Sequence, residues 1–168
     1  MIEFGIVGAK NSGKTTLVEL LIPLFVAKDL KVATVKHTGH AHTFDTEGKD
    51  SYRHRQAGAG LTMAIGKAEM GIFALPDEQY QQIAWKISAE HFDICLVEGD
   101  KSSARPKLFL TRNQDALKGN MPENIVASYG ETALNNSVPN FDSEHLAELV
   151  RFILDCEYAD ANTKGAVI

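Results

Sequence analysis

The stretch Gly8-Ala9-Lys10-Asn11-Ser12-Gly13-Lys14-Thr15 fits the pattern G-x-x-x-x-G-K-[ST]. It stands between an apolar run at 4–7 and a helical pattern at 15–27. Glycines let the backbone turn its N–H groups toward a polyphosphate, and the start of a helix adds positive dipole at the same place. The sequence therefore predicts a phosphate-binding loop, in which Lys14 reaches the β- and γ-phosphates and Thr15 offers its hydroxyl to Mg²⁺.

The bulk composition is that of an ordinary globular domain. The 168 residues have a formal net charge of -5, a pI of about 5.7 and two cysteines. An acidic chain argues against a general nucleic-acid binder, whose surface would be basic, and two cysteines give no disulfide framework. A strand is expected from the N-terminus on, without a charged leader, and no apolar stretch approaches the length that spans a bilayer. We therefore expect a cytoplasmic protein with no membrane segment.

Apolar runs alternate with helical patterns along the chain. Strands are expected at 4–7, 31–35, 61–65, 70–75, 93–97, 107–111 and 125–127. Helices are expected at 15–27, 49–57, 77–90 and 143–154, the last two capped by Asp77 and Ser143. This alternation is typical of an α/β fold of the P-loop NTPase type, a mostly parallel sheet with helices on both faces. We expect one nucleotide-binding domain over 1–156 and a frayed tail over 157–168.

Ligands of such sheets bind beyond the carboxyl ends of the strands, which draws attention to Glu98. This carboxylate follows the apolar strand 93–97 and precedes Gly99. Beside a phosphate loop it could hold Mg²⁺, directly or through water, and orient an attacking water. We therefore expect Glu98 to be a catalytic and metal-binding residue. The alternative is a solvated turn residue, and the division of labour between Glu98 and Asp100 stays open.

The loop 36–48 is rich in histidines and carboxylates. One interpretation is a metal site on three of its side chains, His37, His40 and His42. No standard zinc spacing fits them and no thiolate helps, so a mobile loop beside the triphosphate is the better interpretation. In that interpretation Asp45 lies near the metal, and Lys36 or His37 lies near anionic groups. The remaining alternative is an exposed polar loop.

The segment 101–112 has four basic side chains without an intervening acidic one, namely Lys101, Arg105, Lys107 and Arg112. In a chain of negative net charge this local excess is unusual. It could clamp a phosphorylated second ligand, or an acidic face of a partner protein. A solvated rim is the alternative.

Taken together, these segments resemble the molybdopterin-guanine dinucleotide biosynthesis protein B (MobB) family. Many families share the phosphate loop, but the order and spacing of the other segments are specific. They are Val35-Lys36-His37-Thr38, Gly48-Lys49-Asp50-Ser51, Ala57-Gly58-Ala59, Leu96-Val97-Glu98-Gly99-Asp100-Lys101, and Pro106-Lys107 leading to Arg112. The resemblance covers about residues 2–154. It departs at Gly39 and Asp100, where the family often has a further histidine and an aromatic residue.

The resemblance implies a protein that binds GTP with Mg²⁺, hydrolyses it slowly, forms homodimers and associates with the MobA-like guanylyltransferase that attaches GMP to molybdopterin. The nucleotide-binding residues expected from the phosphate loop are Gly8, Ala9, Lys10, Asn11, Ser12, Gly13, Lys14, Thr15 and Thr16. The metal-binding residues expected are Thr15, Asp45 and Glu98. A preference for guanine over adenine has no support in the residues, because the Asn-Lys-x-Asp pattern is absent and the segment 111–115, Thr-Arg-Asn-Gln-Asp, does not replace it.

Two functions stay open at this point. The first is an adaptor that binds GTP and delivers or stabilises it for a partner transferase, with hydrolysis incidental. The second is a small-molecule kinase or ligase in which Lys101, Arg105 or Lys107 holds an acceptor. The sequence has no obvious arginine-rich lid helix, which weighs against the kinase. A nucleotide-switched regulator is disfavoured by the missing guanine motif.

Overall fold

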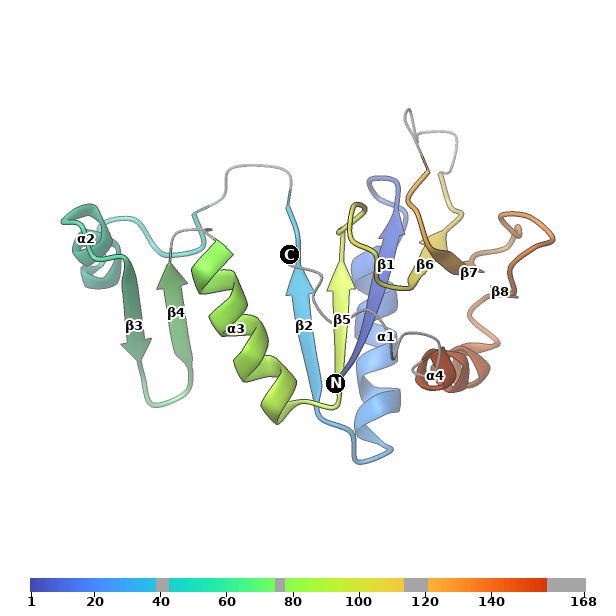
Figure 1. Cartoon of the computed structure of the whole chain (residues 1–168), viewed down its shortest axis with the longest axis horizontal. Coiled ribbons are helices and arrows are strands. Elements are labelled where there is room, and N and C mark those ends of the chain that lie inside the picture. Colours follow the sequence, from blue (N-terminus) through green and yellow to red (C-terminus); the bar gives the residue numbers. More distant parts are fainter. Residues whose placement is uncertain (39–42, 75–77, 114–120, 157–168) are drawn as a thin grey trace. The chain divides into compact units, whose positions relative to one another are not determined.

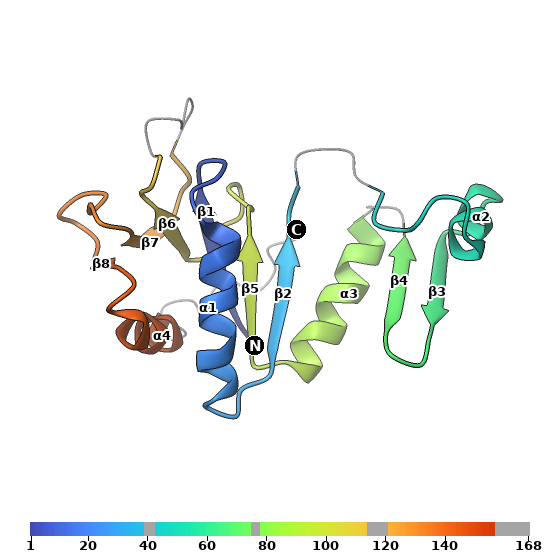
Figure 2. The same ribbon diagram turned by 180° about the vertical axis from the view of Figure 1, so that it is seen from behind.

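A computed structural model describes residues 1–38, 43–74, 78–113 and 121–156 of the chain (Figures 1 and 2). Its elements are β1 (Ile2–Gly8), α1 (Lys14–Val26), β2 (Val32–Lys36), α2 (Asp50–Gln56), β3 (Leu61–Ile65), β4 (Met70–Ala74), α3 (Glu78–His91), β5 (Ile94–Glu98), β6 (Lys107–Leu110), β7 (Ile125–Tyr129), β8 (Asn140–Phe141) and α4 (Leu146–Asp155). They form two compact units. The first takes Met1–His37 and the chain from Lys86 to its described end, and the second takes Thr38–Trp85.

The first unit is built on a parallel sheet. Within the described residues this sheet has six strands in the order β2-β5-β1-β6-β7-β8. β1 lies between β5 and β6, pairing from Ile2↔Ile94 along one edge and as far as Gly8↔Leu110 along the other. β5 is a continuous apolar run, and Ile94 through Val97 are fully buried. Such runs are typical of central parallel strands, which are covered on both faces.

Two helices pack on one face of this sheet and form its main core. In α1, Leu17, Leu21 and Phe25 recur every four residues, so they share one side of the helix and are buried against the strands. Figure 2 shows α1 lying across β1 and β5. α4 packs beside α1 and adds its own apolar side. The fully buried side chains that meet here include Phe4, Ile6, Leu96, Leu108, Leu110, Leu149 and Ile153.

The second unit combines α2 with the antiparallel hairpin β3–β4. Its strands pair from Leu61↔Ala74 to Ile65↔Met70. Arg55 ties the two parts together, since its guanidinium lies 5.8 Å from the centre of the Tyr52 ring and 5.6 Å from that of Phe73. The side of the hairpin that carries Phe73 is therefore the side that meets α2.

The expected fold class is confirmed, and most expected elements are found within one or two residues of their predicted ends. The closing helix is an exception, because α4 begins at Leu146 after an N-cap at His145 rather than at Ser143. His145 makes no side-chain capping hydrogen bond, and Asp142 accepts the backbone N–H of Glu144 at 2.8 Å in the turn before the helix. The short β8 was not expected. Asp77 and the tail 157–168 lie outside the described residues.

In the part of the chain that the structure describes, no helix combines the length and the apolar character needed to cross a bilayer.

Candidate functional site

The phosphate loop joins β1 to α1 and depends on its two glycines. A Cβ at Gly8 would lie 2.8 Å from the Ser12 hydroxyl oxygen and 3.0 Å from the Leu110 Cβ, so no larger residue fits where β1 ends beside β6. Gly13 has φ of 96°, a conformation that costs a glycine little. Asn11 also has positive φ, at 60°. The loop is thus a compact turn that opens directly into a helix N-terminus.

The Lys14 ammonium lies within this loop. Its Nζ donates to the carbonyl oxygens of Gly8 (3.3 Å) and Ala9 (2.6 Å). Burial lowers the pKa of Lys14, the charge of Glu98 opposes this shift, and the Lys101 and Lys36 ammonium groups add to it. Three ammonium groups and one carboxylate therefore act on each other here. The result is a local excess of positive charge in a chain whose net charge is -5.

The structure brings Thr15 and Glu98 together, as the strand-end rule predicts. The Thr15 hydroxyl lies 3.1 Å from each oxygen of the Glu98 carboxylate. The Lys36 Nζ lies 3.4 Å from Glu98 Oε1 and 3.4 Å from the Thr15 hydroxyl oxygen. This meeting follows from the sheet order, because Glu98 ends β5 between Lys36 at the end of β2 and the loop after β1.

These groups suit one particular kind of metal site. Among the described residues there is no cluster of three or more His, Cys, Asp or Glu side chains that could hold an ion. Magnesium, however, is usually bound by one or two carboxylates together with phosphate oxygens and water. The Thr15 hydroxyl and the Glu98 carboxylate are oxygen ligands of that type. They fit an ion that arrives with a polyphosphate rather than a site that binds metal alone.

The histidine-rich loop 36–48 gives less support for a metal site than its composition suggests. His40 and His42 lie outside the described residues, so the three-histidine interpretation stays a prediction. The His37 backbone N–H donates to the Glu98 carbonyl oxygen at 2.8 Å, which fixes the end of β2 beside the carboxylate. Of the two residues expected near anionic groups, Lys36 has its ammonium beside Glu98.

Asp45 belongs to the second unit and is engaged there. Its side chain is 4% exposed. One oxygen accepts the Ser51 hydroxyl at 2.9 Å and the other accepts the Arg55 guanidinium at 3.0 Å. In the structure Asp45 therefore anchors the loop before α2 to that helix. Its role at the metal stays a prediction.

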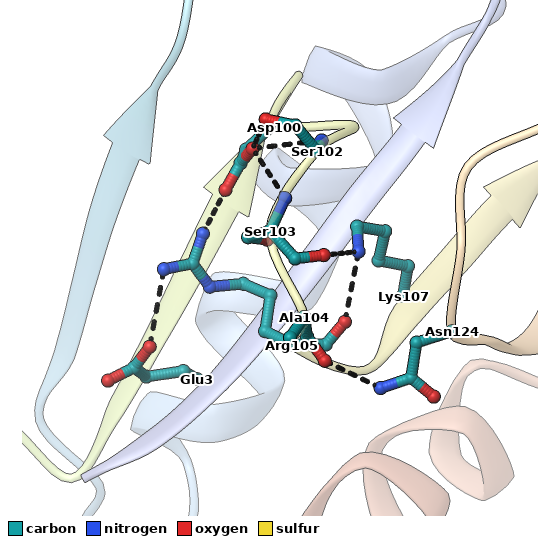
Figure 3. Close-up of polar contacts among 8 residues, drawn as sticks. All are labelled: Glu3, Asp100, Ser102, Ser103, Ala104, Arg105, Lys107 and Asn124. Atoms are coloured by element: carbon teal, nitrogen blue, oxygen red, sulfur yellow. Dashed lines mark hydrogen bonds and ion pairs between the residues drawn. The ribbon is translucent and has the colours of Figure 1, made fainter. Parts of the chain in front are cut away.

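In the basic segment 101–112, the interpretation of Arg105 and Lys107 as parts of an anion clamp is wrong. Arg105 and Lys107 are buried at 6% and 0% exposure (Figure 3). Arg105 is ion-paired with Asp100 and with Glu3, the latter at 3.3 Å. Lys107 donates to three backbone carbonyl oxygens, those of Ser103, Arg105 (3.2 Å) and Glu123 (3.1 Å). These cations therefore hold the loop after β5 against the sheet, while Lys101 and Arg112 are exposed.

Asp100 is the centre of this buried network. One of its oxygens accepts the N–H groups of Ser102 (3.3 Å) and Ser103 (3.2 Å), and the other meets Arg105. Burial opposes ionisation, but the hydrogen bonds from Ser103 and the charge of Arg105 outweigh it, and the pKa of Asp100 falls below its usual value. Asp100 is thus a structural carboxylate, whereas Glu98, two residues earlier, is the one that faces Thr15.

Comparisons of the sequence and the fold with known proteins assign the chain to a family. The family model for molybdopterin guanine dinucleotide synthesis protein B matches residues 3–131. The molybdopterin-guanine dinucleotide biosynthesis adapter protein of Escherichia coli is 34% identical over 133 residues, 77% of this chain and 74% of that protein. Its namesake in Haemophilus influenzae is 36% identical over 115 residues, 66% of this chain but only 63% of that protein. The crystal structure of Bacillus subtilis MobB superposes with a TM-score of 0.74 and 25% identity, covering 93% of this chain and 98% of that one. This chain therefore belongs to the MobB family.

Proposed function

We propose that this protein binds GTP with Mg²⁺ and acts as an accessory protein of molybdopterin guanine dinucleotide biosynthesis, assisting a MobA-like guanylyltransferase. The observation that carries the proposal is the meeting of Thr15 with Glu98 beside Lys14, within a phosphate loop of a MobB-family chain. The relatives' names describe adapter proteins of this pathway. We expect a cytoplasmic location, in line with such a role.

In this proposal each polar group of the site has a separate task. The backbone N–H groups of the loop and the Lys14 ammonium bind the phosphate oxygens. Thr15 and Glu98 would hold the Mg²⁺ ion, which would supply positive charge to neutralise the phosphates. Glu98 also accepts a hydrogen bond from the water that attacks the γ-phosphorus, while the bond to the bridging oxygen breaks. Thr15 and Lys36 both contact the Glu98 carboxylate, and we expect hydrolysis to be slow.

The competing kinase or ligase loses support. It required Lys101, Arg105 or Lys107 to hold an acceptor, and two of these three cations are buried in the network around Asp100. An adaptor needs no site for an acceptor molecule, so the burial of Arg105 and Lys107 does not argue against it.

A protein partner is supported by the hairpin β3–β4. Leu61, Met63, Ile65, Met70 and Ile72 share one face of it, because directly paired residues such as Met63↔Ile72 point to the same side. All five side chains are exposed, Ile65 at 76%. Exposed apolar patches of this kind mark interaction sites. We propose that a second copy of the chain covers this face and forms the homodimer that the resemblance implies.

The function can be tested with binding measurements on purified protein. A fluorescent GTP analogue should bind in the presence of Mg²⁺, and calorimetry should detect association with the guanylyltransferase. Hydrolysis should stay slow with every small acceptor offered, whereas strong stimulation by one acceptor would favour the kinase or ligase. Sedimentation of wild type and Ile65→Lys should distinguish dimer from monomer. A wild-type monomer at micromolar concentration would contradict the homodimer alone.

A further inference from the structure

We propose that Lys101 is a further phosphate-binding residue, which contacts the terminal phosphate of a bound nucleoside triphosphate, and that the buried network around Asp100 positions it. The inference rests on the proposed function and deepens it, because it assumes that the phosphate loop binds a triphosphate. It names the residue by which the protein would distinguish GTP from GDP.

The loop 99–106 joins β5 to β6, the two neighbours of β1 in the sheet. Both of its ends are hydrogen-bonded to β1. The Gly99 N–H donates to the Ile6 carbonyl oxygen at 3.1 Å, and the Pro106 carbonyl oxygen accepts the Gly5 N–H at 2.8 Å. The loop is therefore fixed to the same strand that leads into the phosphate loop.

The first turn of this loop is held by buried contacts on both sides of Lys101. Asp100 accepts the backbone N–H groups of Ser102 at 3.3 Å and Ser103 at 3.2 Å, and its other oxygen is ion-paired with the buried Arg105. Figure 3 shows Asp100 and Ser102 at the carboxyl end of β5. Lys101 stands between them in the chain and is itself exposed. Its backbone is thus fixed by the fold, while its side chain is accessible to a ligand.

A buried ion pair is an expensive way to hold a loop. The desolvation of Asp100 and Arg105 offsets much of their attraction, and apolar side chains of similar volume often give a fold that is equally stable. What a buried pair can supply is a single, well-defined conformation. We infer that this conformation is needed because it sets the position of Lys101.

The charges around the phosphate loop favour the arrival of an anion at Lys101. The Lys36 ammonium is paired with Glu98 at 3.4 Å. No residue that the structure describes forms a hydrogen bond or an ion pair with the Lys101 ammonium. Its charge is one of the causes that lower the pKa of Lys14, so these two ammonium groups are close enough to repel each other. A bound polyanion would remove this repulsion.

The place of Lys101 in the sequence indicates which phosphate it would contact. The lysine of a phosphate loop reaches the β- and γ-phosphates, and the carboxylate after the neighbouring strand lies on the side of the metal and the attacking water. Lys101 follows that carboxylate, Glu98, by three residues. It would therefore bind oxygens of the terminal phosphate, which a diphosphate lacks. Hydrogen bonds between an ammonium group and a phosphate are charge-assisted and strong.

The central experiment compares two nucleotides that differ in this phosphate. Affinities for GDP and for GMPPNP, a non-hydrolysable GTP analogue, are measured by calorimetry with Mg²⁺ for wild type, Lys101→Met and the control Lys31→Met. Lys31 is an exposed lysine just before β2, at the opposite end of the same sheet. Lys101→Met should bind GMPPNP about tenfold or more weakly and GDP within about twofold of wild type. Lys31→Met should match wild type for both nucleotides.

Two outcomes would overturn the assignment of Lys101. One is an equal loss of affinity for GDP and GMPPNP, which is what a general positive field without a specific contact would produce. The other is no loss for either nucleotide. The proposed function fails separately, if Lys14→Ala binds GMPPNP as tightly as wild type does.

A double-mutant cycle tests the role of the network. Asp100→Asn keeps an acceptor for the N–H groups of Ser102 and Ser103 but loses the charge that pairs with Arg105. In the wild-type background it should reduce the ratio of GMPPNP affinity to GDP affinity. In the Lys101→Met background it should leave this ratio unchanged, because the network acts on the ratio only through Lys101. Circular dichroism checks that each variant is folded at the temperature used. The same reduction in both backgrounds, or in neither, would overturn the positioning role.

Discussion

Two polar clusters lie beside the same strand, β5, and they are built in opposite ways. At the phosphate loop, Glu98 meets Thr15 and Lys36 over 3.1–3.4 Å, and the Lys36 side chain is 58% exposed. In the loop after β5, Asp100 and Arg105 are about 5% exposed, and each has several short contacts within the protein. The charged groups of the buried cluster bind one another and nearby backbone groups. The exposed one keeps groups that a ligand can exchange, and this distinguishes a binding site from a structural network of the same composition.

The largest expected effect concerns binding at the loop. Lys14→Ala should abolish nucleotide binding and leave the fold intact, because this ammonium contacts loop carbonyls rather than the core. Titration with a fluorescent GTP analogue and circular dichroism would measure both properties. Lys28→Ala, an exposed lysine just beyond the other end of α1, is the matched control and should bind as wild type does. Unchanged affinity in Lys14→Ala would remove the phosphate site.

The buried cluster should respond in the opposite way. Lys107→Met should lower the free energy of unfolding by about 3 kcal/mol or more, since three buried or part-buried carbonyl groups lose their donor. Urea denaturation would measure the change. Lys101→Met, an exposed lysine in the same loop, should stay within about 0.5 kcal/mol of wild type. Equal effects of the two substitutions would contradict the structural role of Lys107.

Glu98→Gln tests whether the charge of Glu98 is needed for metal binding and hydrolysis. The amide keeps the shape of the side chain but loses its charge, so Mg²⁺-dependent hydrolysis should fall about 100-fold while nucleotide affinity stays within about tenfold. Phosphate release at saturating nucleotide is the measurement. Hydrolysis at the wild-type rate would make Glu98 a turn residue.

Lys36 should have a smaller effect. Its ammonium competes with Mg²⁺ for the Glu98 carboxylate, and an exposed ion pair of this kind contributes about 0–1 kcal/mol. Lys36→Ala should therefore lower the Mg²⁺ concentration needed for half-maximal nucleotide binding by no more than about fivefold. A higher Mg²⁺ requirement would show that Lys36 binds phosphate instead.

The smallest expected effect is the response of the buried cluster to acid. The pKa of Asp100 is lower in the folded protein than its usual value of 3.8. Its ionised form therefore stabilises the fold above that value, and the stabilisation is lost as pH falls through the folded pKa. Asp100→Asn should be less stable than wild type at neutral pH, and the difference should shrink in acid. Urea midpoints measured from neutral pH to about pH 3 would show a constant difference if Asp100 had no such role.

The sequence predicted the site better than it predicted the buried network, for a physical reason. The phosphate loop is contiguous, and Glu98 follows from the rule that strand ends meet at one edge of a parallel sheet. Arg105 pairs with Glu3, 102 residues away, so counting charges within 101–112 could not show that this cation is satisfied. The start of the last helix was predicted three residues early, because Ser143 is a residue type that often caps a helix, whereas α4 has its N-cap at His145 and no side-chain capping hydrogen bond. The cavity lined by Ser12, Thr111, Gly130 and Ser143 could not be predicted either, because its walls come from the segments after four different strands, β1, β6, β7 and β8.

The position of β1 in the sheet has a consequence for synthesis on the ribosome. The strand that leads into the phosphate loop is made first, but its partners are residues 94–98 and 107–110. One edge of β1 therefore stays unpaired until residue 98 has emerged, and the other until residue 110 has emerged. The hairpin β3–β4 lies between them and depends only on neighbours in sequence, so it can form at once. The nascent chain can thus form the hairpin of the second unit before its central sheet. Until the sheet forms, β1 has unpaired edges and is the segment most in need of protection from aggregation.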